Sequence, residues 1–147
     1  VYSALTYFEK LDQLGDRVVI IGGGLVGTEA ALDLAVTHGK QVTIVEMLGQ
    51  LAPDAWRTHR IPLLERVEEH VSVCLNARCT NISEDAAGSN IDIPADSVIL
   101  AVGMRPNSEA AEAFRFTALD YVPIGDCVKI QNIFGAIHTG YYAALDL

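Results

Sequence analysis

Residues 18–36 read VVIIGGGLVGTEAALDLAV, and this stretch decides the fold. Its first four residues form a β-branched run without a polar break, which is typical of a parallel strand buried on both faces. Three glycines end that run, and apolar side chains then recur on one broad face until Gly39, which favours a helix over residues 25–38. The stretch therefore predicts a buried strand, a tight glycine turn and a helix, in that order.

The glycine turn matches the pattern G-x-G-x-x-G at Gly22, Gly24 and Gly27. In such a turn the first glycine permits the sharp change of direction, the second lets a pyrophosphate approach the backbone, and the third lets the helix pack closely on the strand. Leu25 and Val26 open the helix, whose N-terminal amides attract phosphate. Because a strand and a helix flank the turn, the sequence predicts a dinucleotide site here rather than an ordinary loop.

An acidic residue follows at the distance that such a site requires. Residues 41–46, QVTIVE, form a second β-branched strand ending in Glu46, roughly twenty residues beyond the last glycine. A carboxylate at this place accepts both hydroxyls of an adenine ribose and repels a 2′-phosphate, and residues 47–52, from Met47 onward, contain no Arg or Lys to receive one. The pattern favours NAD(H) over NADP(H). A solvated glutamate at a strand end is the alternative interpretation, and it fits the register of Glu46 less well.

Two parallel strands joined by a helix make a right-handed βαβ unit, so the expected fold class is α/β. We expect a Rossmann-like three-layer domain with a central parallel sheet, crossover helices and a small antiparallel β-meander. Residues 1–15 lack clean alternation and are expected to form a connecting arm. The remaining expected elements are a helix over 55–70 with a kink or late start at Pro62, a strand over 71–75, a meander built from 79–83, a turn around Gly88, 91–93 and 97–102, a helix over 108–116, a strand over 121–124 and a last helix over 132–145.

Composition argues against several classes of function. The formal net charge of -9 disfavours contact with nucleic acid or an anionic membrane surface, and no apolar run approaches the ~20 residues of a membrane helix. Three cysteines without a secretory signal indicate a reducing compartment, so we expect a cytoplasmic protein. The four histidines lack the spacing of a metal site, and no metal is expected. The first residue is Val1, as expected of a processed or excised chain.

The runs VVIIGGGLVGTEAALDLA, QVTIVEM, AVGMRPN and IGDC together resemble the pyridine nucleotide-disulphide oxidoreductase superfamily, over nearly the whole chain. More narrowly, the sequence resembles the C-terminal part of flavin- and iron-sulphur-containing NADH:flavin oxidoreductases, the group with dienoyl-CoA and enoate reductases of old-yellow-enzyme type. The resemblance implies an NAD(H) domain inserted into an FAD domain, with one G-x-G-x-x-G for each nucleotide. Because this sequence contains one such pattern, the missing FAD-binding and substrate domains of the same polypeptide are its expected partners.

The resemblance also assigns roles to single residues. It implies that Glu29 lies near the nicotinamide, that Gly103 lets the dinucleotide pass close to a strand end, and that Asp126 binds the ribityl and phosphate region of FAD. On this basis residues 16–104 are the NAD(H)-binding domain, and residues 105–147 are a return segment of an incomplete FAD-binding domain. The expected cofactors are NAD(H) here and FAD in the intact protein.

No catalytic residue is expected within the chain. Cys74 and Cys79 have the C-x4-C spacing of the superfamily's redox disulphide, but that pair belongs to a helix of the missing flavin half, so we interpret the spacing as coincidence. The leading hypothesis is an NADH-binding domain that orients NADH for hydride transfer to FAD and is inactive alone. The alternative is a non-catalytic nucleotide-binding or sensory module. A self-contained dehydrogenase ranks last, because no acid–base set of that kind is found.

Overall fold

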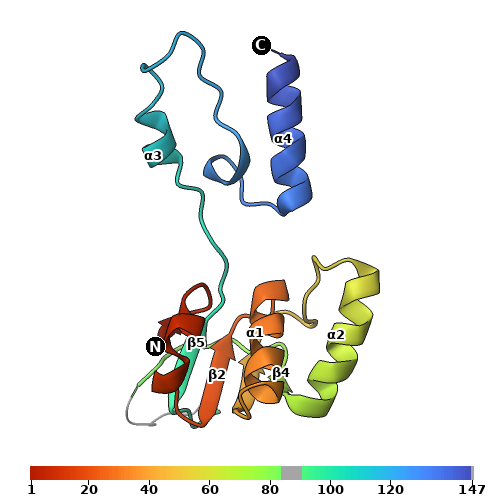
Figure 1. Ribbon diagram of the computed structural model, residues 1–147. Coiled ribbons are helices and arrows are strands. Elements are labelled where there is room, and N and C mark those ends of the chain that lie inside the picture. The colour runs from red at the N-terminus through yellow and green to blue at the C-terminus, as the bar shows by residue number, and fades with distance from the viewer. Residues whose placement is uncertain (84–90, 147) are drawn as a thin grey trace. The chain divides into compact units, whose positions relative to one another are not determined.

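The computed structural model describes residues 1–83 and 91–146, and its central feature is a five-stranded parallel sheet (Figure 1). The strands lie in the order β1-β5-β2-β3-β4. Val19 and Ile20 of β2 point to opposite faces and are both buried, as expected of a central parallel strand. The bounds are β1 Tyr2–Ser3, β2 Arg17–Ile21, β3 Gln41–Val45, β4 Ser72–Cys74 and β5 Ser97–Leu100. The expected α/β class with a parallel sheet is confirmed.

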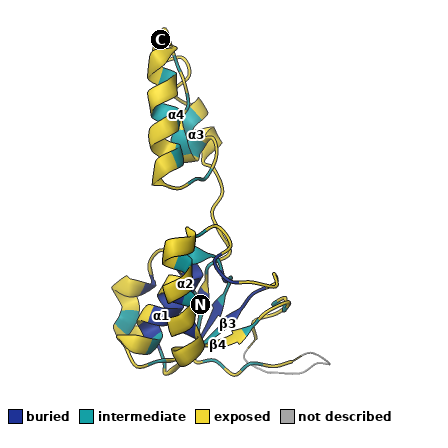
Figure 2. Cartoon of the chain, turned by 90° about the vertical axis from the view of Figure 1, so that its right-hand side faces the viewer, coloured by how far each residue is buried: buried dark blue, intermediate teal, exposed yellow. Residues whose placement is uncertain are grey.

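Three helical segments share one hydrophobic core with the sheet: η1 Tyr7–Gln13, α1 Leu25–Val36 and α2 Arg57–His70. Ile20 lies in register with both Ile44 and Ile99, and all three side chains are fully buried against this layer. Figure 2 shows the buried residues concentrated on α1 and the central strands. The connections β1-η1-β2, β2-α1-β3 and β3-α2-β4 all advance in one direction, so right-handed crossovers put the helices on the same face. The expected helix over 55–70 begins at Arg57 and runs through Pro62.

The expectation of an antiparallel meander is wrong for the described residues. β5 lies parallel between β1 and β2, and its residues Ser97 and Ile99 are buried, so it is an interior strand of the parallel sheet. Residues 79–83 and 91–93 form neither helix nor strand. Ile91 is 91% exposed, so the alternation in these segments has no covered face that would stabilise a strand. The turn expected around Gly88 lies outside the described residues.

The N-terminal residues contribute more structure than a connecting arm. β1 pairs with β5 as an edge strand, with Tyr2 opposite Ile99. Ala4, Tyr7 and Leu14 are buried in the hydrophobic core. Their apolar positions are too irregularly spaced to indicate a regular helix, which is why the sequence pattern does not reveal η1.

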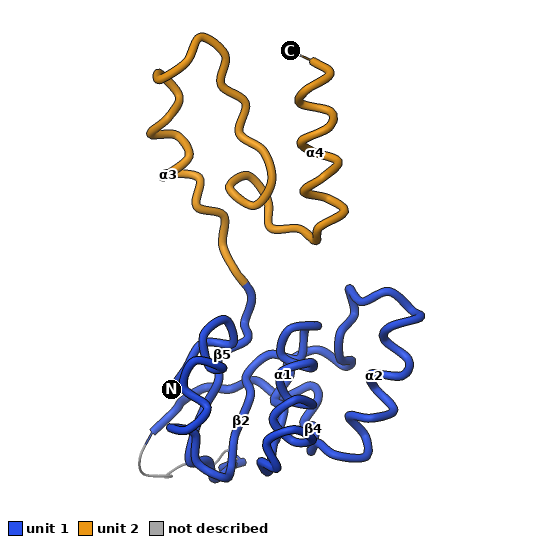
Figure 3. Tube along the Cα trace, viewed as in Figure 1, with its two compact units in different colours: residues 1–103 blue, residues 104–147 orange. Residues whose placement is uncertain are grey.

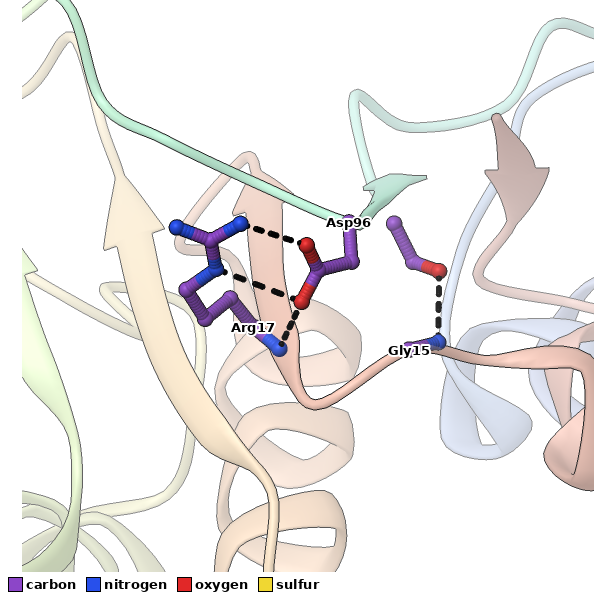
Figure 4. A network of polar contacts seen from close by, with 4 residues as sticks. Gly15, Arg17 and Asp96 are labelled. Carbon is purple, nitrogen blue, oxygen red and sulfur yellow. Dashed lines mark hydrogen bonds and ion pairs between the residues drawn. The ribbon is translucent and has the colours of Figure 1, made fainter.

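A bidentate ion pair fastens β5 to β2 at their amino-terminal ends (Figure 4). The guanidinium of Arg17 donates to both carboxylate oxygens of Asp96, from Nε at 3.2 Å and from the terminal nitrogen at 2.6 Å. The backbone amide of Arg17 donates to Asp96 at 2.9 Å, and the amide of Gly15 donates to the Ser97 hydroxyl at 3.1 Å. These hydrogen bonds from Arg17 lower the pKa of Asp96 to about 2.

The chain divides into two compact units, Val1–Gly103 and Met104–Leu147 (Figure 3). The second unit contains α3 Ser108–Glu112, η2 Gly125–Cys127 and α4 Ile133–Leu145, and α4 contacts η2. The last predicted helix is confirmed, and the Asn132 side chain caps it by accepting from the amide of Gly135 at 2.9 Å. The prediction of a strand over 121–124 is wrong, because these residues form no strand. Pro123 lacks an amide donor, and residues 104–146 provide no strand to pair with. No described residue of this unit is buried.

Candidate dinucleotide site

The candidate site lies where the carboxyl ends of β2, β3 and β5 meet. Gly22 follows β2, Glu46 follows β3, and Gly103 comes shortly after β5. The last residue of β2, Ile21, is in register with the last residues of β3 and β5, so the three strand ends lie side by side. From β2 the chain crosses over to β3, which lies on one side of β2. The neighbour on the other side is β5, the last strand in the sequence, so this place is a topological switch point. Open α/β sheets bind ligands at such points.

The glycines of the loop differ in what surrounds them and therefore in why glycine is suited to each position. Gly22 has φ +107°, and a Cβ there would lie 2.4 Å from the carbonyl oxygen of Ala101. A Cβ on Gly27 would lie 2.1 Å from the carbonyl oxygen of Gly22, so α1 can pack this closely on β2 only with glycine at that position. A Cβ on Gly24 would meet nothing within 4 Å. The space above Gly24 is therefore open, as a loop that receives a pyrophosphate requires.

The N-terminus of α1 has amides without intrahelical acceptors. Gly24 is the N-cap residue, no side chain caps the helix, and its first turn contains no acidic residue. The backbone amides of Leu25 and Val26 therefore lie at the positive end of the helix dipole without a helical partner. Val26 is 48% exposed, so this end of the helix is accessible to solvent. Such an end favours a bound anion.

Thr28 is a site residue that the sequence analysis missed. It is fully buried, and its hydroxyl donates within the glycine loop, with Gly23 O at 3.1 Å and Gly24 O at 2.9 Å. Its backbone amide also donates to the carbonyl of Gly24 at 3.0 Å. Thr28 therefore fixes the turn from β2 into α1. A threonine directly after the third glycine was the only available signal.

Glu46 is buried and hydrogen-bonded to the backbone. Its residue exposure is 7%, one carboxylate oxygen accepts from the amide of Gly23 at 2.5 Å, and the other accepts from the amide of Leu48 at 2.7 Å. Glu46 is thus not the solvated strand-end glutamate of the alternative interpretation. An ionised carboxylate offers about four acceptor sites, so two are not used by these backbone bonds. Met47, the next residue, is 68% exposed beside it in the sequence.

Gly23, the middle glycine, is also closely surrounded, which the motif pattern does not indicate. A Cβ there would lie 2.3 Å from Leu51 Cδ2 and 3.0 Å from Glu46 Cβ. Its carbonyl accepts from the amide of Ala52 at 2.7 Å. Both polar groups of Gly23 are therefore held by residues 46–52, which we call the bracing segment.

Glu29 lies on α1 and pairs with a histidine of α2. Its carboxylate is 2.9 Å from Nε2 of His59, and both side chains are about half exposed. The pairing was not predicted from the sequence, in which 30 positions separate His59 from Glu29. The pair joins the amino-terminal halves of α1 and α2.

Gly103 and Asp126 belong to different units. Gly103 is the last residue of the first unit and has φ +90°, which favours glycine, with open space where a Cβ would stand. Asp126 lies in η2 of the second unit, where its carboxylate accepts from the amide of Gln131 at 3.1 Å. The other sequence-predicted site residues all lie in the first unit.

Thiols and possible metal ligands also occur in residues 1–83 and 91–146. Cys74, Cys79 and Cys127 are free thiols. No group of three or more His, Cys, Asp or Glu side chains in this part of the chain could hold a metal ion. No helix in it is long and apolar enough to cross a membrane.

Comparison with known proteins supports the resemblance seen in the sequence. The chain is 36% identical to a bilirubin reductase of Mediterraneibacter gnavus over 98% of this chain and 23% of that protein. It is 32% identical to a cinnamate reductase of Clostridium sporogenes, over its whole length and 23% of the relative. A solved 2-naphthoyl-CoA reductase, 27% identical, matches 97% of this chain with a TM-score of 0.78 and is covered to 23%.

The chain therefore spans about a quarter of the length of these relatives. The model of one family, described as pyridine nucleotide-disulphide oxidoreductase, matches residues 3–138. Its members depend on FAD and NAD(H), the two cofactors expected from the sequence. The protein belongs to the pyridine nucleotide-disulphide oxidoreductase family.

Proposed function

We propose that this chain carries the NADH-binding domain of an FAD-dependent oxidoreductase and orients NADH for hydride transfer to the flavin. The observation that carries the proposal is the glycine loop, with open space at Gly24 beside the uncapped N-terminus of α1. The loop backbone and the helix amides fit a pyrophosphate without any basic side chain. Bound NADH supplies the hydride and the flavin accepts it, while this chain binds and orients the dinucleotide.

The preference for NADH over NADPH rests on Glu46. The carboxylate is buried at the end of β3 and held by two backbone amides, so it cannot swing away from a ligand. Its remaining lone pairs suit two ribose hydroxyls, and its charge opposes a 2′-phosphate. Glu29 would then lie near the nicotinamide, and Gly103 would let the dinucleotide pass close to the end of β5, as the family resemblance implies.

Residues 105–147 are proposed to belong to the FAD-binding domain of the same polypeptide, with Asp126 at the flavin. The second unit contains no buried residue among those described, and α4 exposes Ile133, Phe134 and Ile137 by 80%, 60% and 64%. An apolar helix of this kind needs a covering surface, and the much longer relatives have room for one. The free cysteines agree with a cytoplasmic location.

The direct test is a calorimetric titration of the chain with NADH and, separately, with NADPH. We expect NADH to bind and NADPH to bind more weakly, because only NADPH places a phosphate near Glu46. Equal affinity for the two would contradict the role of Glu46 in specificity. Absence of binding by either would contradict the proposal that this chain alone forms the site.

A second assay separates binding from turnover. The sequence contains a single G-x-G-x-x-G pattern, which we assign to NADH, so we expect no steady oxidation of NADH unless a flavoprotein is added. Sustained NADH oxidation by the chain alone, measured by the loss of NADH absorbance, would contradict the proposal that this chain binds and orients NADH while the flavin accepts the hydride. The unique tryptophan, Trp56, is 74% exposed at the start of α2 and offers an optical signal for the same titrations.

A further inference from the structure

Arg60 of α2 reaches the bracing segment. Its Nε donates to the carbonyl of Leu51 at 2.9 Å, and a terminal nitrogen lies 3.4 Å from the side-chain oxygen of Gln50. The sequence of the bracing segment contains no Arg or Lys, so the fold supplies from a neighbouring helix a cation that the sequence analysis did not place there. Arg60 is only partly exposed; its hydrogen bond to Leu51 is part-buried, whereas its contact with Gln50 is exposed.

The residues next to the Arg60 hydrogen bond contact the glycine loop. Leu51 is 6% exposed, and its side chain occupies the space where a Cβ on Gly23 would stand. Ala52 is fully buried, and its amide donates to the carbonyl of Gly23 at 2.7 Å. A continuous series of contacts therefore runs from the guanidinium of Arg60 through Leu51 and Ala52 to the peptide of Gly23.

The bracing segment needs such support because its backbone is strained. Ala52 has φ +45°, a left-handed conformation that a residue with a Cβ rarely adopts. Strained backbone persists when surrounding contacts hold it in place. Here the contacts on either side are the Arg60 bond to the preceding carbonyl and the Gly23 bond to the Ala52 amide.

We infer that Arg60 is a positioning residue for the dinucleotide site, holding the bracing segment in the shape that fixes the Gly23 peptide and, with it, the phosphate-binding loop. The inference rests on the proposed function and adds a residue on α2 that acts through Leu51 and Ala52. A loop that is fixed before binding loses less entropy when the ligand arrives, so losing the Arg60 contact should weaken binding of the pyrophosphate.

The test uses the full chain with Arg60→Met, which keeps the aliphatic stem and removes the donors. Arg60→Lys keeps the charge and one possible donor. Arg66→Met is the matched control, because Arg66 is an exposed arginine of the same helix that forms no side-chain hydrogen bond with the described residues. ADP-ribose, which contains the pyrophosphate, and adenosine, which does not, are titrated into each variant.

We expect Arg60→Met to weaken ADP-ribose binding about tenfold, because a loop that is no longer fixed before binding must be ordered when the ligand arrives. Arg60→Lys should recover part of the loss, while adenosine binding and the Arg66→Met control should stay unchanged. Equal weakening for ADP-ribose and adenosine would overturn the inference, because it would indicate a general effect on the fold. Unchanged ADP-ribose binding would overturn it as well.

Amide hydrogen exchange in the ligand-free chain separates this inference from the proposed function. Arg60→Met should speed exchange at the amides of Gly23 and Ala52, which donate to Glu46 and Gly23 respectively. Unchanged exchange at these two amides would overturn the role of Arg60, whether or not the chain binds a dinucleotide. Failure of the unmodified chain to bind ADP-ribose would instead contradict the proposed function.

Discussion

The carboxylate of Glu46 and the amide of Gly23 are joined by a hydrogen bond of 2.5 Å across 23 positions of the sequence. Glu46 thus lies at the end of β3 and also holds the glycine loop that follows β2. Glu46 therefore has a structural role in the ligand-free chain in addition to the proposed contact with ribose. Mutations at Glu46 must be evaluated for stability before they are interpreted for specificity.

Glu46→Gln is expected to lower the free energy of unfolding by about 1–3 kcal/mol, because its side-chain amide has one acceptor oxygen where the carboxylate accepts two backbone hydrogen bonds, one buried and one part-buried. Urea denaturation of the chain measures this loss. Glu65→Gln on α2, at an exposed position, is the control and should leave stability unchanged. Equal stability of Glu46→Gln and the unmodified chain would contradict the structural role of Glu46.

Gly27→Ala is expected to destabilise the first unit by about 1–3 kcal/mol, since the added Cβ would press against the backbone carbonyl of Gly22 and force α1 away from β2. Thermal unfolding followed by circular dichroism tests this. Gly140→Ala in α4 is the matched control, because its Cβ would meet only Ile124 at an ordinary 3.7 Å. A neutral Gly27→Ala would show that the close approach of helix and strand is not required.

The pair Arg17 and Asp96 should make stability depend on acidity. The pKa of Asp96 is lowered from 3.8 to about 2 by hydrogen bonds from Arg17, so the pair stabilises the folded chain above the unfolded-state pKa. That contribution is lost as pH falls through the window between these two values. Asp96→Asn should remove this part of the acid dependence in urea titrations at several pH values. An unchanged profile would contradict it.

Removal of residues 104–147 should leave the first unit folded. Among the residues that the structure describes, all those of the buried core lie within Val1–Gly103, so truncation after Gly103 should preserve the far-ultraviolet spectrum of that unit and its urea midpoint. The truncated chain should also bind less of a hydrophobic dye, because the exposed apolar residues of α4 are gone. Loss of cooperative unfolding after truncation would show that the second unit supports the first.

Much of the first unit could be predicted because its signals are local. The glycines at 22, 24 and 27, the β-branched runs and Gly39 specify the β2-α1-β3 unit, and the structure has these elements within two residues of their expected ends. Glu46 could be placed at the end of β3 for the same reason. Parallel strands covered on both faces produce runs that are easily recognised.

The remaining parts depend on contacts between distant residues. Nothing local in YS at residues 2–3 reveals an edge strand, because its formation depends on β5 far along the chain. The alternation in residues 79–83 and 91–93 suggested strands, but these residues form none, and Ile91 is 91% exposed. Arg60 and His59 gained their partners through the packing of α2, which spacing in the sequence does not encode.

Gly24→Ala tests the central claim most directly. A Cβ at this position meets no protein atom, and its φ of -63° suits alanine, so the variant should be as stable as the unmodified chain. The same methyl group would occupy the space proposed for the pyrophosphate. Calorimetric titration with NADH should therefore detect binding to the unmodified chain and a loss of at least about tenfold in the variant. Equal NADH affinity in the two equally stable chains would contradict the assignment of this loop as the dinucleotide site.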